Sequence, residues 1–114
     1  MTEKRMAERY NVEKLPENLK SFLLDTLQDK DFMAETYDAS SIGIGLSVPN
    51  HISLFSLNDH IVLKSLDDDF RLVGQIRYIH DRGNEGCRIG IEFKQSKSIS
   101  LYRSLLDPVV QTAN

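Results

Sequence analysis

The chain has 114 residues, which is enough for one ordinary domain and too few for two full ones. Hydrophobic residues make up 40% and charged residues 27%, a composition typical of a globular protein and not of a disordered chain. With 14 Lys and Arg against 17 Asp and Glu, the formal net charge is −3, which argues against a protein that coats nucleic-acid polymers. The single cysteine, Cys87, excludes an internal disulfide and a zinc site built from several cysteines.

The first 18 residues are polar, contain Pro16 and show neither helical nor strand periodicity. We therefore expect residues 1–18 to form a mobile N-terminal arm and residues 19–114 to form the folded domain. The charged start of the chain does not resemble a signal peptide, and no apolar run approaches the roughly 18 residues that cross a bilayer. We expect a cytoplasmic protein that does not insert into membranes, and the lone thiol agrees with a reducing compartment.

Six short segments of the remaining chain have strand character, with turn residues between them. In chain order they cover residues 21–27, 32–37, 42–48, 61–66, 70–78 and 87–94. The alternation is clear in the fifth segment, where Phe70, Leu72, Ile76 and Tyr78 are predicted to share one face. The aspartate run at 67–69 is predicted to be a solvated hairpin tip. Hairpin-like connections between six strands predict an antiparallel sheet that curls or closes to protect its edges.

The C-terminal part of the chain changes to a helical period. Its apolar stripe consists of Ile99, Tyr102, Leu105 and Leu106. Pro108 is expected to end this helix near residue 106 or 107, because the residue before a proline avoids the helical conformation. A helix this short is not stable alone, so we expect its stripe to cover one opening of the barrel.

The sequence does not favour an enzyme. His51, His60 and His80 are far apart, and neither a second histidine nor a carboxylate cluster accompanies them at metal-ligand spacing. The chain also has no Gly-x-Ser-x-Gly nucleophile elbow and no Gly-Lys-Ser/Thr phosphate loop. Cys87 lies within a predicted strand and is expected to be a buried small hydrophobe. We therefore predict neither a catalytic site nor a metal site.

Two arginines near the N-terminus, Arg5 and Arg9, are four residues apart and follow Lys4. The planar guanidinium group offers two parallel donors, which fit a phosphate or the O6/N7 edge of guanine. Two such groups on a short arm can close over an anion from one side. The alternative interpretation of this segment alone is a solvated charged tail.

A second group of polar residues, Asp38-Ala39-Ser40-Ser41-Ile42-Gly43, lies between two predicted strands. In an extended segment Asp38 and Ser40 point to the same side, so a carboxylate and a hydroxyl face one ligand together. The carboxylate can accept hydrogen bonds from guanine N1–H and from its exocyclic amine. Gly43 allows a tight turn or a close backbone approach. The alternative is an ordinary turn, since Asp, Ser and Gly favour turns for local reasons.

Together, the Arg-x-x-x-Arg pair and the following Asp-x-Ser-x-x-Gly segment resemble the motifs of the PilZ domain family. The segments Gly74–Tyr78 and Arg88–Phe93 are similar to the late strands of that family. The resemblance extends from Arg5 to about Leu106. It implies an all-β fold, a six-stranded antiparallel β-barrel with a C-terminal α-helix.

The resemblance also implies a function, the binding of cyclic di-GMP (c-di-GMP), a bacterial second messenger. In that family the arginine motif grips phosphate and guanine, and these roles fall on Arg5 and Arg9. The second motif holds a guanine on the barrel surface, and this role falls on Asp38, Ser40 and Gly43. Many members begin the first motif with two adjacent arginines. Here the leading position is Lys4, which keeps the positive charge but has no planar fork.

These observations predict a receptor without cofactor or catalytic role, whose arm folds over c-di-GMP and alters a surface that a downstream protein recognises. The main alternative is a PilZ-fold adaptor that contacts proteins and does not bind nucleotide. A small hydrolase would need a histidine within hydrogen-bond reach of a serine hydroxyl in a concave pocket. A barrel that binds single-stranded nucleic acid is disfavoured by the acidic charge and by the lack of an aromatic stacking ladder.

Overall fold

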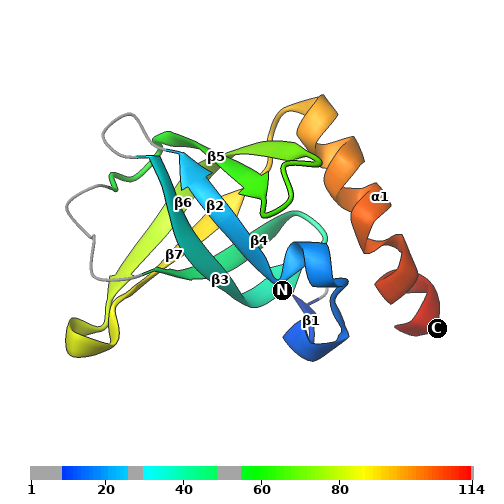
Figure 1. Ribbon diagram of the computed structural model, residues 1–114, viewed down its shortest axis with the longest axis horizontal. Helices are drawn as coiled ribbons and strands as arrows, with labels where there is room; N and C mark the ends of the chain where they lie inside the picture. Colours follow the sequence, from blue (N-terminus) through cyan, green and yellow to red (C-terminus); the bar gives the residue numbers. More distant parts are fainter. Residues whose placement is uncertain (1–8, 26–29, 49–54, 114) are drawn as a thin grey trace, which may run out of the picture.

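The computed structural model describes residues 9–25, 30–48 and 55–113. The described residues form seven strands and one α-helix, with short 3-10 turns between some of them (Figure 1). The strands are β1 (Arg9–Tyr10), β2 (Ser21–Asp25), β3 (Lys30–Ser40), β4 (Gly43–Val48), β5 (His60–Ser65), β6 (Arg71–Asp81) and β7 (Cys87–Glu92). The helix is α1 (Ser96–Ala113), and the 3-10 turns are η1 (Val12–Lys14), η2 (Glu17–Leu19) and η4 (Gly83–Glu85).

Six of the strands close into a barrel. They are paired in the order β3-β2-β5-β6-β7-β4, and β4 pairs back to β3. Every pairing is antiparallel. Closure removes the unpaired strand edges that would otherwise invite association. The predicted six-stranded antiparallel barrel with a C-terminal helix is confirmed, and β1 is an additional strand that pairs with the end of β3.

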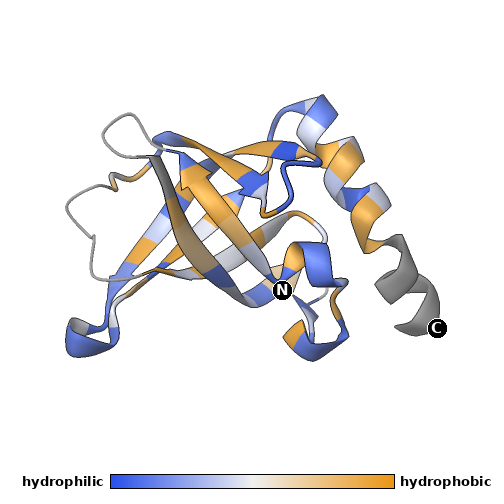
Figure 2. Cartoon of the chain, in the orientation of Figure 1, coloured by the Kyte–Doolittle hydropathy of each residue, from blue (hydrophilic) through white to orange (hydrophobic). Residues whose placement is uncertain are grey.

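The core lies inside the barrel and is made by the inward-facing residues of each strand. Phe22, Leu63, Leu72 and Ile89 come from four different strands and are completely buried. Burying a side chain of this size contributes about 1.5–3 kcal/mol, so these positions stabilise the closed sheet. Figure 2 shows apolar residues along the strands and polar residues at the hairpin between β6 and β7. Cys87 is buried as predicted, and burial raises the pKa of its thiol.

Two β-bulges interrupt the alternation on which the strand predictions depend. In β6 the pairing with β7 shifts between Ile76 and Tyr78, so Arg77 is an extra residue. The prediction that Tyr78 shares the core face with Ile76 is therefore wrong, because the side chain of Tyr78 is on the outer surface and is 42% exposed. A similar shift in β3 lies between Thr36 and Asp38. Both bulges lie next to the pocket described below.

The helix α1 lies across one end of the barrel, where Tyr102 and Leu106 are buried in the core (Figure 1). The prediction that Pro108 ends this helix is wrong, because α1 continues to Ala113. A proline within a helix removes the hydrogen bond to the carbonyl four residues earlier, which here belongs to Ser104. Ser104 is exposed, so water can hydrate that carbonyl and the helix continues.

The segment preceding β2 packs onto the barrel from Arg9 onward. Asn11 caps η1 by accepting a hydrogen bond from the Glu13 amide at 2.9 Å. Leu15 and Leu19 are buried in the core. Within the segment predicted to be a mobile arm, residues 9–18 thus make specific contacts with the folded domain. None of the helices in the described ranges combines the length and apolar character needed to cross a bilayer.

Candidate functional site

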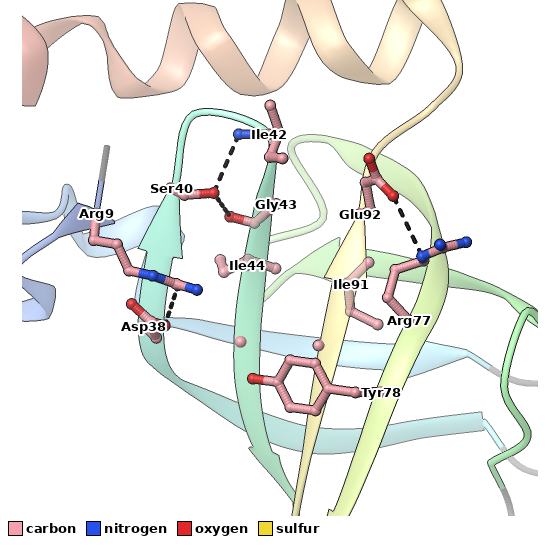
Figure 3. A pocket seen from close by; sticks show the side chains of 12 residues that line it. Arg9, Asp38, Ser40, Ile42, Gly43, Ile44, Arg77, Tyr78, Ile91 and Glu92 are labelled. Carbon is pink, nitrogen blue, oxygen red and sulfur yellow. Dashed lines mark hydrogen bonds and ion pairs between the residues drawn. The ribbon is translucent and has the colours of Figure 1, made fainter. Parts of the chain in front are cut away.

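A pocket of about 270 Å³ opens on the outer surface of the barrel, where β1, β3, β4, β6 and β7 come together (Figure 3). It is lined by Arg9, Asp38, Ser40, Ile42, Gly43, Ile44, Gly45, Arg77, Tyr78, Gly90, Ile91 and Glu92. Four of the six predicted site residues, Arg9, Asp38, Ser40 and Gly43, are in this set. The other two, Lys4 and Arg5, lie outside the described residues.

Strand pairing brings the two predicted motifs together. In the register of β1 with β3, Arg9 lies opposite Ser40 and Tyr10 opposite Ala39. The guanidinium of Arg9 can therefore reach Asp38, and the two side chains form a hydrogen-bonded ion pair. Asp38 is 25% exposed and Arg9 is 68% exposed at the side chain. A carboxylate has about four acceptor positions and a guanidinium five N–H donors, so both groups keep capacity for a ligand.

The hydroxyl of Ser40 helps to shape the turn between β3 and β4. Its Oγ accepts a hydrogen bond from the Ile42 amide at 3.3 Å and lies 3.5 Å from the Gly43 carbonyl oxygen. Such a local bond from a serine side chain stabilises a turn. Gly43 is required for close approach, because a Cβ atom there would lie 2.2 Å from the Ile91 carbonyl oxygen. This turn therefore depends on both Ser40 and Gly43.

The floor of the pocket is a row of four cross-strand neighbours. Asp38 is paired with Gly45, Gly45 with Gly90, and Gly90 with Tyr78. The two glycines leave space that an aromatic ring fills: a Cβ atom on Gly90 would lie 2.1 Å from Tyr78 Cε2. The row thus has the carboxylate of Asp38 at one end and the half-exposed ring of Tyr78 at the other.

A second tyrosine supports this ring from the side. The hydroxyl groups of Tyr37 and Tyr78 are hydrogen-bonded, and the Tyr37 ring lies over Gly45. The Arg88 guanidinium lies 4.2 Å from the centroid of the Tyr37 ring, a cation–π contact. Burial, followed by the hydrogen bond to Tyr78, raises the pKa of Tyr37 well above its usual range. The hydrogen bond between the two hydroxyl groups therefore helps to hold the Tyr78 ring in place.

The opposite wall of the pocket carries a third arginine that sequence reasoning did not select. Arg77 is the extra residue of the β6 bulge, and its Nε lies 3.4 Å from Glu92 Oε1 on β7 (Figure 3). Bulges commonly redirect a side chain next to a binding site. Glycines at outward positions of two predicted strands, Gly45 and Gly90, were the available signal for a surface that admits a ligand.

The arrangement is suited to binding a polar planar ligand. It combines guanidinium groups, a carboxylate and an aromatic ring. Neither described histidine, His60 or His80, lines the pocket, and His51 lies outside the described residues. Across the part of the chain that the structure describes, no three His, Cys, Asp or Glu side chains gather in a way that could hold a metal ion.

Comparison with known proteins gives matches at the level of structure. No family model matches the sequence, and no curated protein matches it significantly. MrkH of K. pneumonia, solved as a complex with c-di-GMP, has a TM-score of 0.66 and 13% identity, and the match covers 98% of this chain and 55% of MrkH. The PilZ domain of YcgR from Escherichia coli with c-di-GMP has a TM-score of 0.59 and 18% identity, with coverage of 97% and 98%.

A structure of YcgR from Escherichia coli in complex with c-di-GMP matches with a TM-score of 0.57 and 17% identity. The match covers 97% of this chain and 50% of YcgR. The chain thus spans about half the length of MrkH and of this YcgR chain, and nearly all of the isolated PilZ domain. At sequence identities of 13–18%, these matches show that the chains share a fold. The resemblance drawn from the two sequence motifs is confirmed at that level, and the chain has the fold of the PilZ domain.

Proposed function

We propose that this protein is a receptor for c-di-GMP without a catalytic role, and that the ligand binds in the pocket between β1 and the outer surface of the barrel. One observation carries the proposal. Arg9 and Asp38 belong to different sequence motifs, 29 positions apart, and form an ion pair inside one pocket. The solved structures of MrkH and YcgR, which contain c-di-GMP, support the same ligand.

Asp38 is the proposed guanine acceptor. A guanine offers two neighbouring donors, N1–H and the exocyclic amine, and a carboxylate accepts both. The ion pair with Arg9 fixes the orientation of the carboxylate, and hydrogen bonds from the base to a carboxylate are charge-assisted. Ser40 and Gly43 shape the adjoining turn, so their role is mainly to place the backbone beside the base.

The arginines are the proposed phosphate ligands. Arg9 has a largely exposed side chain with donors to spare, and Arg5 and Lys4 precede it on the proposed arm of residues 1–18. The pocket of about 270 Å³ is slightly smaller than the roughly 300–1,000 Å³ of ordinary ligand sites. A dinucleotide would therefore extend out of it, and the arm would cover the part that extends.

Tyr78 and Arg77 are proposed as further ligand contacts. The Tyr78 ring is half-exposed at the end of the glycine row and presents an apolar surface for a base. Arg77 lies on the opposite wall from Arg9 and can exchange its long contact with Glu92 for a phosphate. The proposal also includes a bacterial, cytoplasmic setting and a downstream protein that recognises the occupied state.

Calorimetry with c-di-GMP tests this proposal and reports both affinity and stoichiometry. Cyclic di-AMP has the same backbone without the guanine edge, so we expect it to bind much more weakly. Asp38→Ala should weaken c-di-GMP binding. Glu35→Ala is the matched control, because Glu35 is an exposed carboxylate on the same strand that does not line the pocket. A folded protein that binds neither nucleotide would overturn the receptor function and favour the protein-interaction adaptor.

A further inference from the structure

The turn between β3 and β4 is held by a tyrosine of the C-terminal helix α1. The hydroxyl of Tyr102 lies 2.7 Å from the Ser40 carbonyl oxygen and 2.8 Å from the Gly43 carbonyl oxygen. These are two of the three residues of the Asp-x-Ser-x-x-Gly motif. Tyr102 is completely buried, and its single O–H proton is shared between these two carbonyl groups.

The remaining carbonyl groups of this turn also accept hydrogen bonds from the end of the barrel and from α1. The Phe93 amide donates to the Ile42 carbonyl oxygen at 3.1 Å. The Arg103 Nε donates a longer bond, at 3.5 Å, to the Ser41 carbonyl oxygen. All four carbonyl groups from Ser40 to Gly43 therefore have donors within residues 93–103. In Figure 3 the helix passes directly above this turn.

The aromatic ring of Tyr102 is fixed independently of its hydroxyl. It packs on Phe93 with ring centroids 4.5 Å apart and an interplanar angle of 49°. Both rings belong to the buried core at this end of the barrel. A phenylalanine at position 102 would keep this packing and lose only the hydrogen bonds to the turn. The hydroxyl can therefore be tested separately from the fold.

We infer that Tyr102 is a positioning residue for the ligand pocket, and that through its hydroxyl the occupied pocket and the docked helix α1 stabilise each other. This inference rests on the proposed function. Ser40 and Gly43 line the pocket on one side of the turn, and their carbonyl groups bond to α1 on the other. If docking of α1 favours the turn geometry that binds ligand, then ligand must favour docking of α1 by the same free energy.

The test compares the original protein with Tyr102→Phe and with a matched control, Ser65→Ala. Ser65 is also a buried hydroxyl that holds a turn, because its Oγ accepts from the amides of Asp69 at 2.7 Å and Phe70 at 3.1 Å. That turn joins β5 to β6 and does not line the ligand pocket. Both variants remove one buried hydroxyl, so both should lose stability to urea.

Only Tyr102→Phe should lose affinity for c-di-GMP, by roughly five- to thirtyfold in calorimetry. Hydrogen–deuterium exchange gives the second readout. In the original protein c-di-GMP should slow exchange over residues 96–106 of α1, and in Tyr102→Phe this protection should be lost or much reduced. The Ser65→Ala control should bind c-di-GMP like the original protein and keep the protection of α1.

Two results would overturn the inference while leaving the receptor function intact. One is c-di-GMP binding by Tyr102→Phe with original affinity and unchanged protection of α1. The other is an equal affinity loss in Ser65→Ala, which would mean that general destabilisation causes the effect. Absence of c-di-GMP binding by the folded original protein would instead overturn the proposed function, and this inference with it.

Discussion

Arg9 and Asp38 form an ion pair between β1 and β3, next to the position where β3 turns into β4. The pair depends on strand register, because Arg9 lies opposite Ser40 and its side chain then reaches two residues back along β3. Neither side chain exhausts its hydrogen-bonding capacity in this contact. In the proposed receptor the ion pair therefore orients both groups toward one ligand.

Substitutions of Arg9 should show whether c-di-GMP binding depends on the planar geometry of the guanidinium group or only on its positive charge. Arg9→Ala should weaken c-di-GMP binding by about 1.5–3 kcal/mol, the range of hydrogen bonds that involve charged groups. Arg9→Lys should recover only part of this, because lysine keeps the charge and loses the planar fork. Arg71→Ala removes an exposed arginine away from the pocket and is the control. Calorimetry that finds equal affinity for Arg9→Lys and the original protein would contradict a role for the fork.

Asp38→Ala should weaken binding of c-di-GMP and leave the stability of the fold almost unchanged. Loss of the acceptor leaves guanine donors unpaired, at a cost of about 1–3 kcal/mol in binding free energy. Thermal stability should change little, because exposed ion pairs such as that of Asp38 with Arg9 contribute about 0–1 kcal/mol. Calorimetry and thermal unfolding of the same samples measure both effects. A variant that unfolds outright would show that Asp38 is mainly a turn residue.

Gly90→Ala should disturb the aromatic end of the pocket. The new methyl group would lie 2.1 Å from Tyr78 Cε2 and 2.5 Å from Tyr78 Cδ2, so the half-exposed ring must move away. We expect weaker c-di-GMP binding with a stability loss of about 1 kcal/mol, since a surface side chain can yield.

A double-mutant cycle with Tyr78→Ala checks the cause of the Gly90→Ala effect. In the Tyr78→Ala background the ring is absent, and Gly90→Ala should cost little further affinity. Full additivity of the two substitutions would contradict the explanation that Gly90→Ala weakens binding by displacing this ring.

Two tyrosines with raised pKa values predict a particular alkaline transition. Burial raises the pKa of both Tyr37 and Tyr102 above the ordinary value of about 10. Folding therefore favours their protonated forms, so this stability is fully present below pH 10 and is lost as the pH rises further. Tyrosinate absorbance and circular dichroism, followed in one pH titration, should show these two groups ionising together with unfolding. Complete ionisation of all four tyrosines in a protein with native circular dichroism would contradict their burial.

The fold was largely predictable because its strands alternate clearly and its motifs have fixed spacing. Phe70, Leu72 and Ile76 share one face of a period-2 pattern in which Gly74 takes the remaining position, and a closed barrel buries that face. The wrong predictions arose where the structure depends on contacts between residues that are distant in the sequence. The bulge at Arg77 is set by the pairing of β6 with β7, so local alternation wrongly assigned Tyr78 to the core. Pro108 is compatible with α1 because the carbonyl group that loses its hydrogen bond belongs to the exposed Ser104, which a local rule does not include.

The candidate site was predictable only where a motif carries it. Asp38, Ser40 and Gly43 are recognisable by spacing, and Arg9 by its partner in the Arg-x-x-x-Arg pair. Arg77 and Tyr78 join them through the bulge and through cross-strand neighbours, which a single sequence does not reveal. Burial of Leu15 and Leu19 likewise depends on a barrel surface formed by distant strands.

The central claim is that c-di-GMP binds in the pocket formed by β1 and the outer faces of β3, β4, β6 and β7. A nuclear magnetic resonance titration of the ¹⁵N-labelled protein with c-di-GMP tests both the binding and its location. The account predicts saturable shifts concentrated on the amides of Arg9, residues 38–45, Tyr78 and residues 90–92. A spectrum of the folded protein that does not change, or changes confined to the β5–β6 turn, which does not line the pocket, would contradict it.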